Sequence, residues 1–144
     1  MATPSRASLP SAEPFTTSGV SRADALALPP GPAVRTVLQI AQAWALSRDQ
    51  AMALVGVDST TVWSGWKKEP DNARLKLHMV ERISHVLGIY RALHTLFDEA
   101  FADAWVLAPN SGDLFRGAPP IERMTGFVVD LAEVHQRLDA EVHR

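Results

Sequence analysis

The sequence has no cysteine among its 144 residues, which excludes disulfide bonds, thiolate catalysis and cysteine-based zinc sites. No apolar run approaches the ~18 residues of a transmembrane helix, and the first residues lack the apolar stretch of a secretory signal. The formal net charge is only −2, so no overall basic field would attract nucleic acid. We therefore expect a cytoplasmic protein in which any DNA binding depends on a local basic patch.

Catalytic and metal-binding motifs are also missing. The chain has no nucleophile–base–orienter set, no glycine-rich phosphate loop and no paired acids in a plausible pocket. Potential metal-ligating residues recur at helical spacing in Glu81–His85, His94–Asp98 and the row His135, Asp139 and His143. The two pairs lack a third ligand at motif spacing, and terminal helices often carry solvated histidine and aspartate. We interpret all of them as helix-surface residues and expect no metal, no cofactor and no enzymatic activity.

Proline is concentrated at the N-terminus, where residues 1–32 hold six of the ten prolines. This segment has no sustained hydrophobic period and would bury too little surface to offset its ordering entropy. We predict a flexible, disordered arm over residues 1–32, which the proline-rich residues 29–32 close. Docking of Phe15 and of the apolar residues 25–28 on a partner is the alternative.

Helical periodicity begins after this arm. Apolar residues at positions i, i+3, i+4 and i+7 predict an amphipathic helix over residues 33–45. Ser47 and Gln50 form a capping box that opens a second helix over residues 48–55, which Gly56 ends. Asp58 is expected to cap a third helix over residues 59–68.

Two short helices joined by a glycine-containing turn are typical of a helix-turn-helix. Hydroxyl side chains suit base edges and phosphates, and basic side chains suit phosphates. The candidate DNA-binding residues are Arg48, Ser59, Thr60, Thr61, Ser64, Lys67 and Lys68. The alternative is a helix pair kept only for packing, with Trp63 and Trp66 in the core or at an interface.

A long apolar stripe follows over residues 75–97 and predicts a helix ~30 Å long. We call it the spine helix, because it would carry the helix-turn-helix on one side and the C-terminal part on the other. The predicted fold is all-α: a flexible arm over residues 1–32, a helix-turn-helix over residues 33–74, and the spine helix with a small helical domain over residues 75–144.

The most unusual stretch is the corner formed by residues 97–126. Aromatic residues at helical spacing end at Pro109, an apolar pair and Arg116–Gly117 follow, and Pro119–Pro120 reopen a helix. On these residues alone, the corner is interpreted as a compact turn between two helices. A terminal amphipathic helix then has its apolar face at Phe127, Val128, Leu131, Val134, Leu138 and Val142.

This corner resembles the toxin-binding domain of the Xre/MbcA/ParS antitoxin family. The resemblance is carried by Trp105, Pro109, Asn110, Leu114, Phe115, Arg116, Gly117, Pro119 and Pro120. Residues 46–66 resemble the Xre type of DNA-binding domain, so the resemblance extends over residues 34–144. Two departures bear on DNA binding: Met52 stands where such motifs place a small residue, and Trp66 lies one residue later than the usual tryptophan.

The resemblance implies an antitoxin whose partner is a RES-domain toxin that degrades NAD or uses it for ADP-ribosylation. The C-terminal half would cover the entrance to the toxin's NAD site, and the N-terminal half would repress the operon by binding operator DNA. The implied toxin-binding residues are Trp105, Asn110, Phe115, Arg116, Arg137, His143 and Arg144.

A free-standing helix-turn-helix transcription regulator, whose C-terminal helices only dimerise, is the alternative function. Both functions predict a homodimer, because one short recognition helix makes few contacts with DNA. Trp44, Trp63 and Trp66 are candidates for the dimer interface, and burial in the core of the monomer is their other interpretation.

Overall fold

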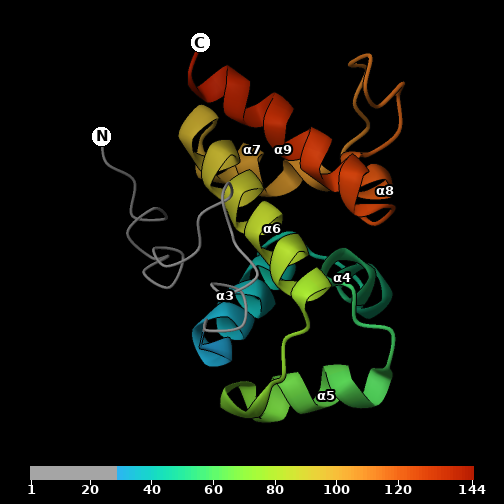
Figure 1. Ribbon diagram of the computed structural model, residues 1–144. Helices are drawn as coiled ribbons and strands as arrows, with labels where there is room; N and C mark the ends of the chain where they lie inside the picture. Colours follow the sequence, from blue (N-terminus) through green and yellow to red (C-terminus); the bar gives the residue numbers. More distant parts are fainter. Residues whose placement is uncertain (1–28) are drawn as a thin grey trace.

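The computed structural model describes residues 29–144, and this part of the chain is all-helical, as predicted (Figure 1). Its α-helices are α3 (Pro30–Ala43), α4 (Arg48–Val55), α5 (Thr60–Lys68), α6 (Leu77–Leu96), α7 (Glu99–Ala104), α8 (Pro120–Met124) and α9 (Val128–Val142). Two 3-10 helices, η2 (Pro70–Asn72) and η3 (Trp105–Leu107), complete the set. The predicted arm, with Phe15 and residues 25–28, lies outside the described residues except for its last four positions.

Helix α6 is the predicted spine helix, and Figure 1 shows it running through the middle of the molecule. Helix α5 lies beyond its first turns, α9 runs alongside it, and α7 lies next to its last turns. Its most extensive packing is against α9. Because 13 of its 20 residues are buried, the helix belongs to the cores of both halves.

The sequence signals for the helix-turn-helix are confirmed around its turn. Ser47 Oγ accepts a hydrogen bond from the Gln50 amide, and Gln50 Oε1 accepts one from the Ser47 amide, which together form the predicted capping box. Gly56 ends α4 with φ +80°. A Cβ atom there would also lie 2.9 Å from His78 Cδ2, so both the backbone and the close approach of α6 require glycine.

Several predicted boundaries are wrong by one to three residues, including those of the spine helix, which runs over Leu77–Leu96 and not over residues 75–97. Helix α3 begins at Pro30, inside the segment assigned to the arm, because proline suits the first helical turn. It ends at Ala43, since Ala45 adopts a left-handed conformation with φ +58°. Ser59, not Asp58, caps α5: its Oγ accepts from the Val62 amide at 3.3 Å, and the helix starts one residue later than predicted.

The three tryptophans proposed for a dimer interface are buried in the core. Trp44, Trp63 and Trp66 are at most 4% exposed, so of their two interpretations the core of the monomer is correct. Trp63 and Trp66 pack against each other and attach α5 to the rest of the domain. Trp44 packs against Tyr90 of α6.

Arg82 of α6 is a buried cation that joins the two halves. Its Nε donates to the Leu54 carbonyl in the last turn of α4 at 2.6 Å, and its Nη2 donates to the Met124 carbonyl at the end of α8 at 2.8 Å. Carbonyls at helix C-termini lack intrahelical partners and carry partial negative charge. The guanidinium therefore satisfies two helix ends that lie far apart in sequence.

Two histidines meet inside the α6–α9 interface. The Nδ1 atoms of His85 and His135 lie 3.0 Å apart, and His135 is only 6% exposed. The interpretation of His135 as a solvated surface residue is therefore wrong. Burial lowers the pKa of His135 to about 4, assisted by His85 and opposed by Asp139. Only one proton fits between the two facing nitrogens, so the contact excludes protonation of both rings at Nδ1 at the same time.

The apolar face predicted for the terminal helix is wrong in its first two residues. Phe127 is 78% exposed and Val128 is 40% exposed, whereas Leu131, Val134 and Leu138 are buried. Phe127 is the N-cap of α9 in extended conformation, so its side chain does not follow the rotation of the helix.

The first prediction concerns the guanidinium that joins both halves. Replacing Arg82→Met should lower the free energy of unfolding by about 3 kcal/mol, because two buried carbonyls lose charged donors. Urea denaturation followed by circular dichroism measures the change. The matched variant Arg91→Met, at an exposed position of the same helix, should change it by less than ~0.5 kcal/mol. Equal effects of the two substitutions would contradict this role of Arg82.

The second prediction concerns the buried histidines. A histidine with a lowered folded pKa binds fewer protons when folded than when unfolded, between about pH 4 and the unfolded value of 6.5. Stability is thus fully present above pH ~6.5 and falls as the pH drops towards 4, by an amount on the order of 3 kcal/mol.

Urea denaturation from pH 7.5 to 4.5 tests this dependence. Carboxylates also titrate in this range, so the informative quantity is the difference between variants. His135→Asn keeps a neutral hydrogen-bonding atom facing His85 and should lose most of the histidine contribution. The exposed His143→Asn variant should retain the full pH dependence. If His135→Asn behaves like His143→Asn, the buried pair does not set the pH dependence.

Candidate functional site

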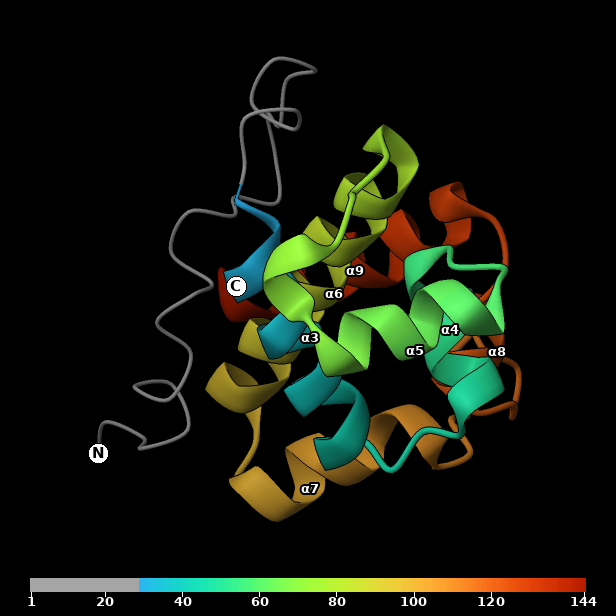
Figure 2. The ribbon, with the colours of Figure 1, turned by 90° about the horizontal axis from the view of Figure 1, so that it is seen from below.

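The outer face of α5 carries most of the candidate DNA-binding residues. Figure 2 shows α5 in front of α3 and α4, with one side turned away from them. Trp63 and Trp66 point inward, and the exposed candidates are Thr60, Thr61, Ser64, Lys67 and Lys68. Ser59 differs from them, because its half-buried hydroxyl is already used as the cap of α5.

Arg48 stands at the exposed start of α4, and its Nε lies 3.5 Å from Asp49 Oδ1. Arg48 and Lys67 line the same surface hollow, although 19 positions separate them in the sequence. The fold therefore brings basic side chains of both short helices to one side of the helix-turn-helix. This arrangement provides the local basic patch that a chain of net charge −2 needs for phosphate contacts.

Asn110 closes the loop that leads from η3 to α8. Its amide donates to the Ala118 carbonyl at 3.3 Å, and its own carbonyl accepts from the Gly117 amide at 2.7 Å. Its side-chain Oδ1 also accepts from the Gly112 amide at 2.9 Å. Asn110 thus holds the two ends of residues 110–118 together.

The aromatic residues of this corner pack against each other. Trp105 and Phe115 form an edge-to-face pair with ring centroids 5.6 Å apart, and both side chains are half-buried. The pair fixes the tip of the loop onto η3. In the structure, Trp105, Asn110 and Phe115 therefore hold the loop in shape, and their contact with a toxin stays a prediction.

Arg116 has an unusual backbone conformation, and its side chain is exposed to solvent. It adopts φ +54°, a left-handed conformation that is uncommon for residues other than glycine, and Gly117 follows with φ +90°. Its side chain is exposed and has no hydrogen bond or ion pair within the described residues. A non-glycine residue held in this conformation is a reason to look for function.

Arg137 links α9 to the same loop. Its Nη1 donates to Asp113 Oδ1 at 3.1 Å, and this bond lowers the pKa of the exposed Asp113 carboxyl. Arg116, Arg123 and Arg137 line one hollow beside the loop, although Arg123 is also paired with Glu133 at 2.7 Å. The fold thus gathers two predicted toxin-binding arginines and one that sequence reasoning missed.

The outer face of α9 runs from these arginines to the end of the chain. Arg137 lies within α9, whereas Arg144 follows the end of the helix and pairs with Glu141 at 2.7 Å. His143 and Val129 are both exposed. The exposure of Val129 was also missed, because an apolar residue beside a buried stripe gives no sign of the direction it faces.

The residues considered as metal ligands make structural contacts at separate places in the fold. His94 Nε2 lies 2.8 Å from Asp103 Oδ1, not beside Asp98, which caps α7 through the Phe101 amide. Residues 29–144 contain no group of three or more side chains arranged to hold a metal ion. Within the same residues, no helix is both long enough and apolar enough to cross a membrane.

Comparison with known proteins matches each half to a domain family. Residues 23–88 match the antitoxin Xre-like helix-turn-helix domain, and residues 92–144 match the antitoxin Xre/MbcA/ParS C-terminal toxin-binding domain. A protein of Sinorhizobium fredii (strain NBRC 101917 / NGR234), the uncharacterized protein y4oB, is 41% identical over 105 residues, which cover 72% of this chain and 78% of that protein.

The two matches meet inside α6, the helix whose Arg82 joins the turn of the helix-turn-helix to the end of α8. Both halves thus match domains of one kind of protein, in the order that the sequence resemblance implies. The chain belongs to the family of Xre-type antitoxins, with an Xre-like helix-turn-helix followed by an Xre/MbcA/ParS C-terminal toxin-binding domain.

Proposed function

We propose that this protein neutralises a RES-domain toxin that consumes NAD and that it represses its own operon as a homodimer. The C-terminal domain would cover the entrance to the toxin's active site without any catalytic step of its own. The observation that carries the proposal is the exposed surface formed by the loop and α9, where Arg116 has no ion pair within the described residues and Arg137 and Arg144 pair only with the exposed acids Asp113 and Glu141.

Several features of this face suit a protein partner. Arginine gives planar, multidentate contacts with carboxylates and phosphates and is enriched at interfaces. Two exposed apolar side chains at the start of α9, Phe127 and Val129, add surface that is unusual for a helix facing only water. The opposite face of α9 is buried on α6, so the outer face has a fixed position when the partner arrives.

The proposed DNA interface is the outer face of α5 together with Arg48. Hydroxyls and lysines there would contact bases and phosphates, while Trp63 and Trp66 keep α5 attached. Because these tryptophans are used in the core, the homodimer needs another surface. A free-standing regulator would not need a toxin-binding domain, so the match to that family favours the antitoxin.

The third prediction concerns the end of α9. His143→Ala with Arg144→Ala should weaken neutralisation of the toxin, because both exposed side chains would face the partner's cleft. Leu138 is the last fully buried residue of α9, so the double substitution leaves the core intact. Removing residues 141–144 should have the same effect. Cell growth and the NAD level are measured while the chain is expressed, from a separate promoter, together with the toxin of the neighbouring gene. Unchanged growth and NAD would exclude these residues from the contact.

The fourth prediction concerns DNA. Lys67→Ala with Lys68→Ala should weaken binding to DNA of any sequence, the operator included. The slope of log K against log salt concentration should become smaller in magnitude by about 0.9 for each lost phosphate contact. Fluorescence anisotropy with the DNA upstream of the operon, at several salt concentrations, measures both quantities.

The two double variants serve as controls for each other. Lys67→Ala/Lys68→Ala should neutralise the toxin normally, and His143→Ala/Arg144→Ala should bind DNA normally. A variant that loses both activities would indicate damage to the fold, and circular dichroism would detect that damage. Intact operator binding by the lysine variant would place the DNA interface elsewhere.

A further inference from the structure

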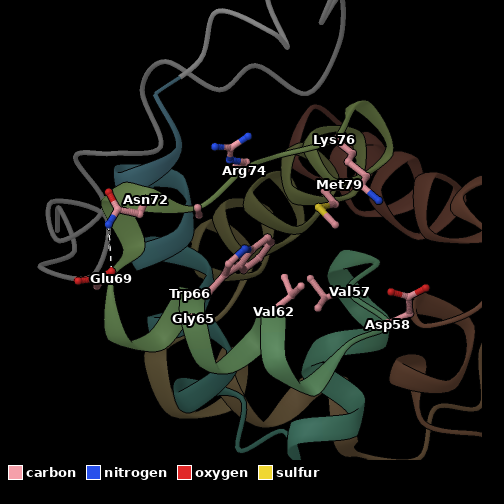
Figure 3. Close-up of a pocket in the computed structure, with 11 residues that line it drawn as sticks. Val57, Asp58, Val62, Gly65, Trp66, Glu69, Asn72, Arg74, Lys76 and Met79 are labelled. Carbon is pink, nitrogen blue, oxygen red and sulfur yellow. Dashed lines mark hydrogen bonds between the residues drawn. The ribbon is translucent and has the colours of Figure 1, made fainter.

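A hollow of about 370 Å³ lies behind the recognition helix, on the side of α5 away from the candidate DNA face. Figure 3 shows Val57, Val62, Trp66 and Met79 turned toward one another around it. Three of these side chains are buried, and Val62 is 41% exposed at the opening. The volume falls in the range of small-molecule sites, roughly 300–1,000 Å³.

The hollow exists because α5 stands away from α6. The neighbour against which α5 packs most is η2, whereas α6 packs on α3, α4, α7 and α9. An extended segment, residues 73–76, closes the gap between η2 and α6. The wall of the hollow is therefore formed by one side of α5, and its floor by residues that α6 and the turn contribute.

Gly65 lines the hollow on the side of α5. A Cβ atom at this position would meet no atom within 4 Å, so packing does not require glycine there. The backbone does not require it either, because Gly65 lies inside α5 and is absent from the positive-φ residues. Glycine inside a helix costs about 1 kcal/mol relative to alanine. The cost of glycine at position 65 is explained if the space that a larger side chain would fill is needed for a ligand.

Charge at the rim selects the type of ligand. Arg74 and Lys76 lie on the closing segment, both are exposed, and neither has an ion pair within the described residues. Among the acids, Glu69 already accepts a hydrogen bond from Asn72 Nδ2 at 3.0 Å, and Asp58 lies on the turn. The two acids lie at opposite sides of the hollow, and the two cations lie on the closing segment between them (Figure 3). A ligand with an apolar body is therefore complementary to the hollow when its negative charge lies at the closing segment.

We propose that the hollow binds a small planar aromatic carboxylate. The ring would contact Trp66 and Met79, whose indole and thioether interact favourably with aromatic rings. The carboxylate would lie near Arg74 and Lys76. Because the ligand touches the inner side of α5, its binding should also change operator affinity; this second effect, unlike the binding itself, rests on the proposed function.

The test uses the full chain labelled with 5-fluorotryptophan, which gives one ¹⁹F signal for each of the four tryptophans. The Trp66→Phe variant assigns the signal of Trp66. Naphthalene-2-carboxylate is the probe, and naphthalene-2-carboxamide is its neutral counterpart. The carboxylate should shift the Trp66 signal, leave Trp105 unchanged, and bind about fivefold tighter than the amide, as an exposed ion pair allows.

Two substitutions separate the apolar and the charged part of the site. Gly65→Leu should fill the hollow and reduce probe affinity by at least about tenfold, whereas Ser64→Leu, on the outer face of α5, should leave it unchanged. Arg74→Gln with Lys76→Gln should make the two probes bind equally. The charge-matched control Lys67→Gln with Lys68→Gln should preserve the difference.

The proposal is overturned if the probe leaves Trp66 unshifted, if it shifts Trp105 instead, or if Gly65→Leu has no effect. Equal binding of the carboxylate and the amide to the natural sequence would exclude the anionic ligand class. Operator binding measured with and without the probe is a separate result. If the probe binds at Trp66 and operator affinity stays constant, the site stands and only its coupling to DNA binding fails.

Discussion

The arrangement of the molecule depends on one buried guanidinium. Arg82 donates to carbonyls of Leu54 and Met124, which lie 28 and 42 residues away in opposite directions. A buried carbonyl that loses its donor costs more than the net value of the bond, so neither helix end moves away easily. The turn of the helix-turn-helix is packed on the same side chain, because a Cβ atom at Gly56 would lie 3.2 Å from Arg82 Cδ. The position of each half is therefore fixed relative to α6.

The C-terminal surface depends on a second contact between distant residues. His85 and His135 face each other between α6 and α9, and Asn110 with the Trp105–Phe115 pair holds the adjoining loop. Arg137 then connects that loop to α9 through Asp113. The exposed arginines are thus presented by a supported surface, and less conformational entropy is lost when such a surface binds than when a free tail does.

Local signals in the sequence predicted most of the fold. The Ser47–Gln50 capping box, Gly56 and the period of the spine helix act within a few residues, so they can be read without knowledge of the tertiary structure. Arg82 and the two facing histidines could not be predicted in this way, because their partners lie 28 to 50 residues away. A charged residue within a helical stripe has the same appearance in sequence whether it is solvated or buried.

The two candidate surfaces lie at opposite ends of the molecule. Figure 1 shows α5 at one end and the outer side of α9 at the other, with α6 between them. A toxin bound at α9 would therefore leave α5 accessible, and the two partners need not compete for one site. Any influence of one on the other has to pass through contacts that both halves share, and Arg82 is the shared contact whose two acceptors belong to different halves. Joint binding of toxin and DNA is thus compatible with this fold, and a coupling between them would be carried by the orientation of α4 and α8 on α6.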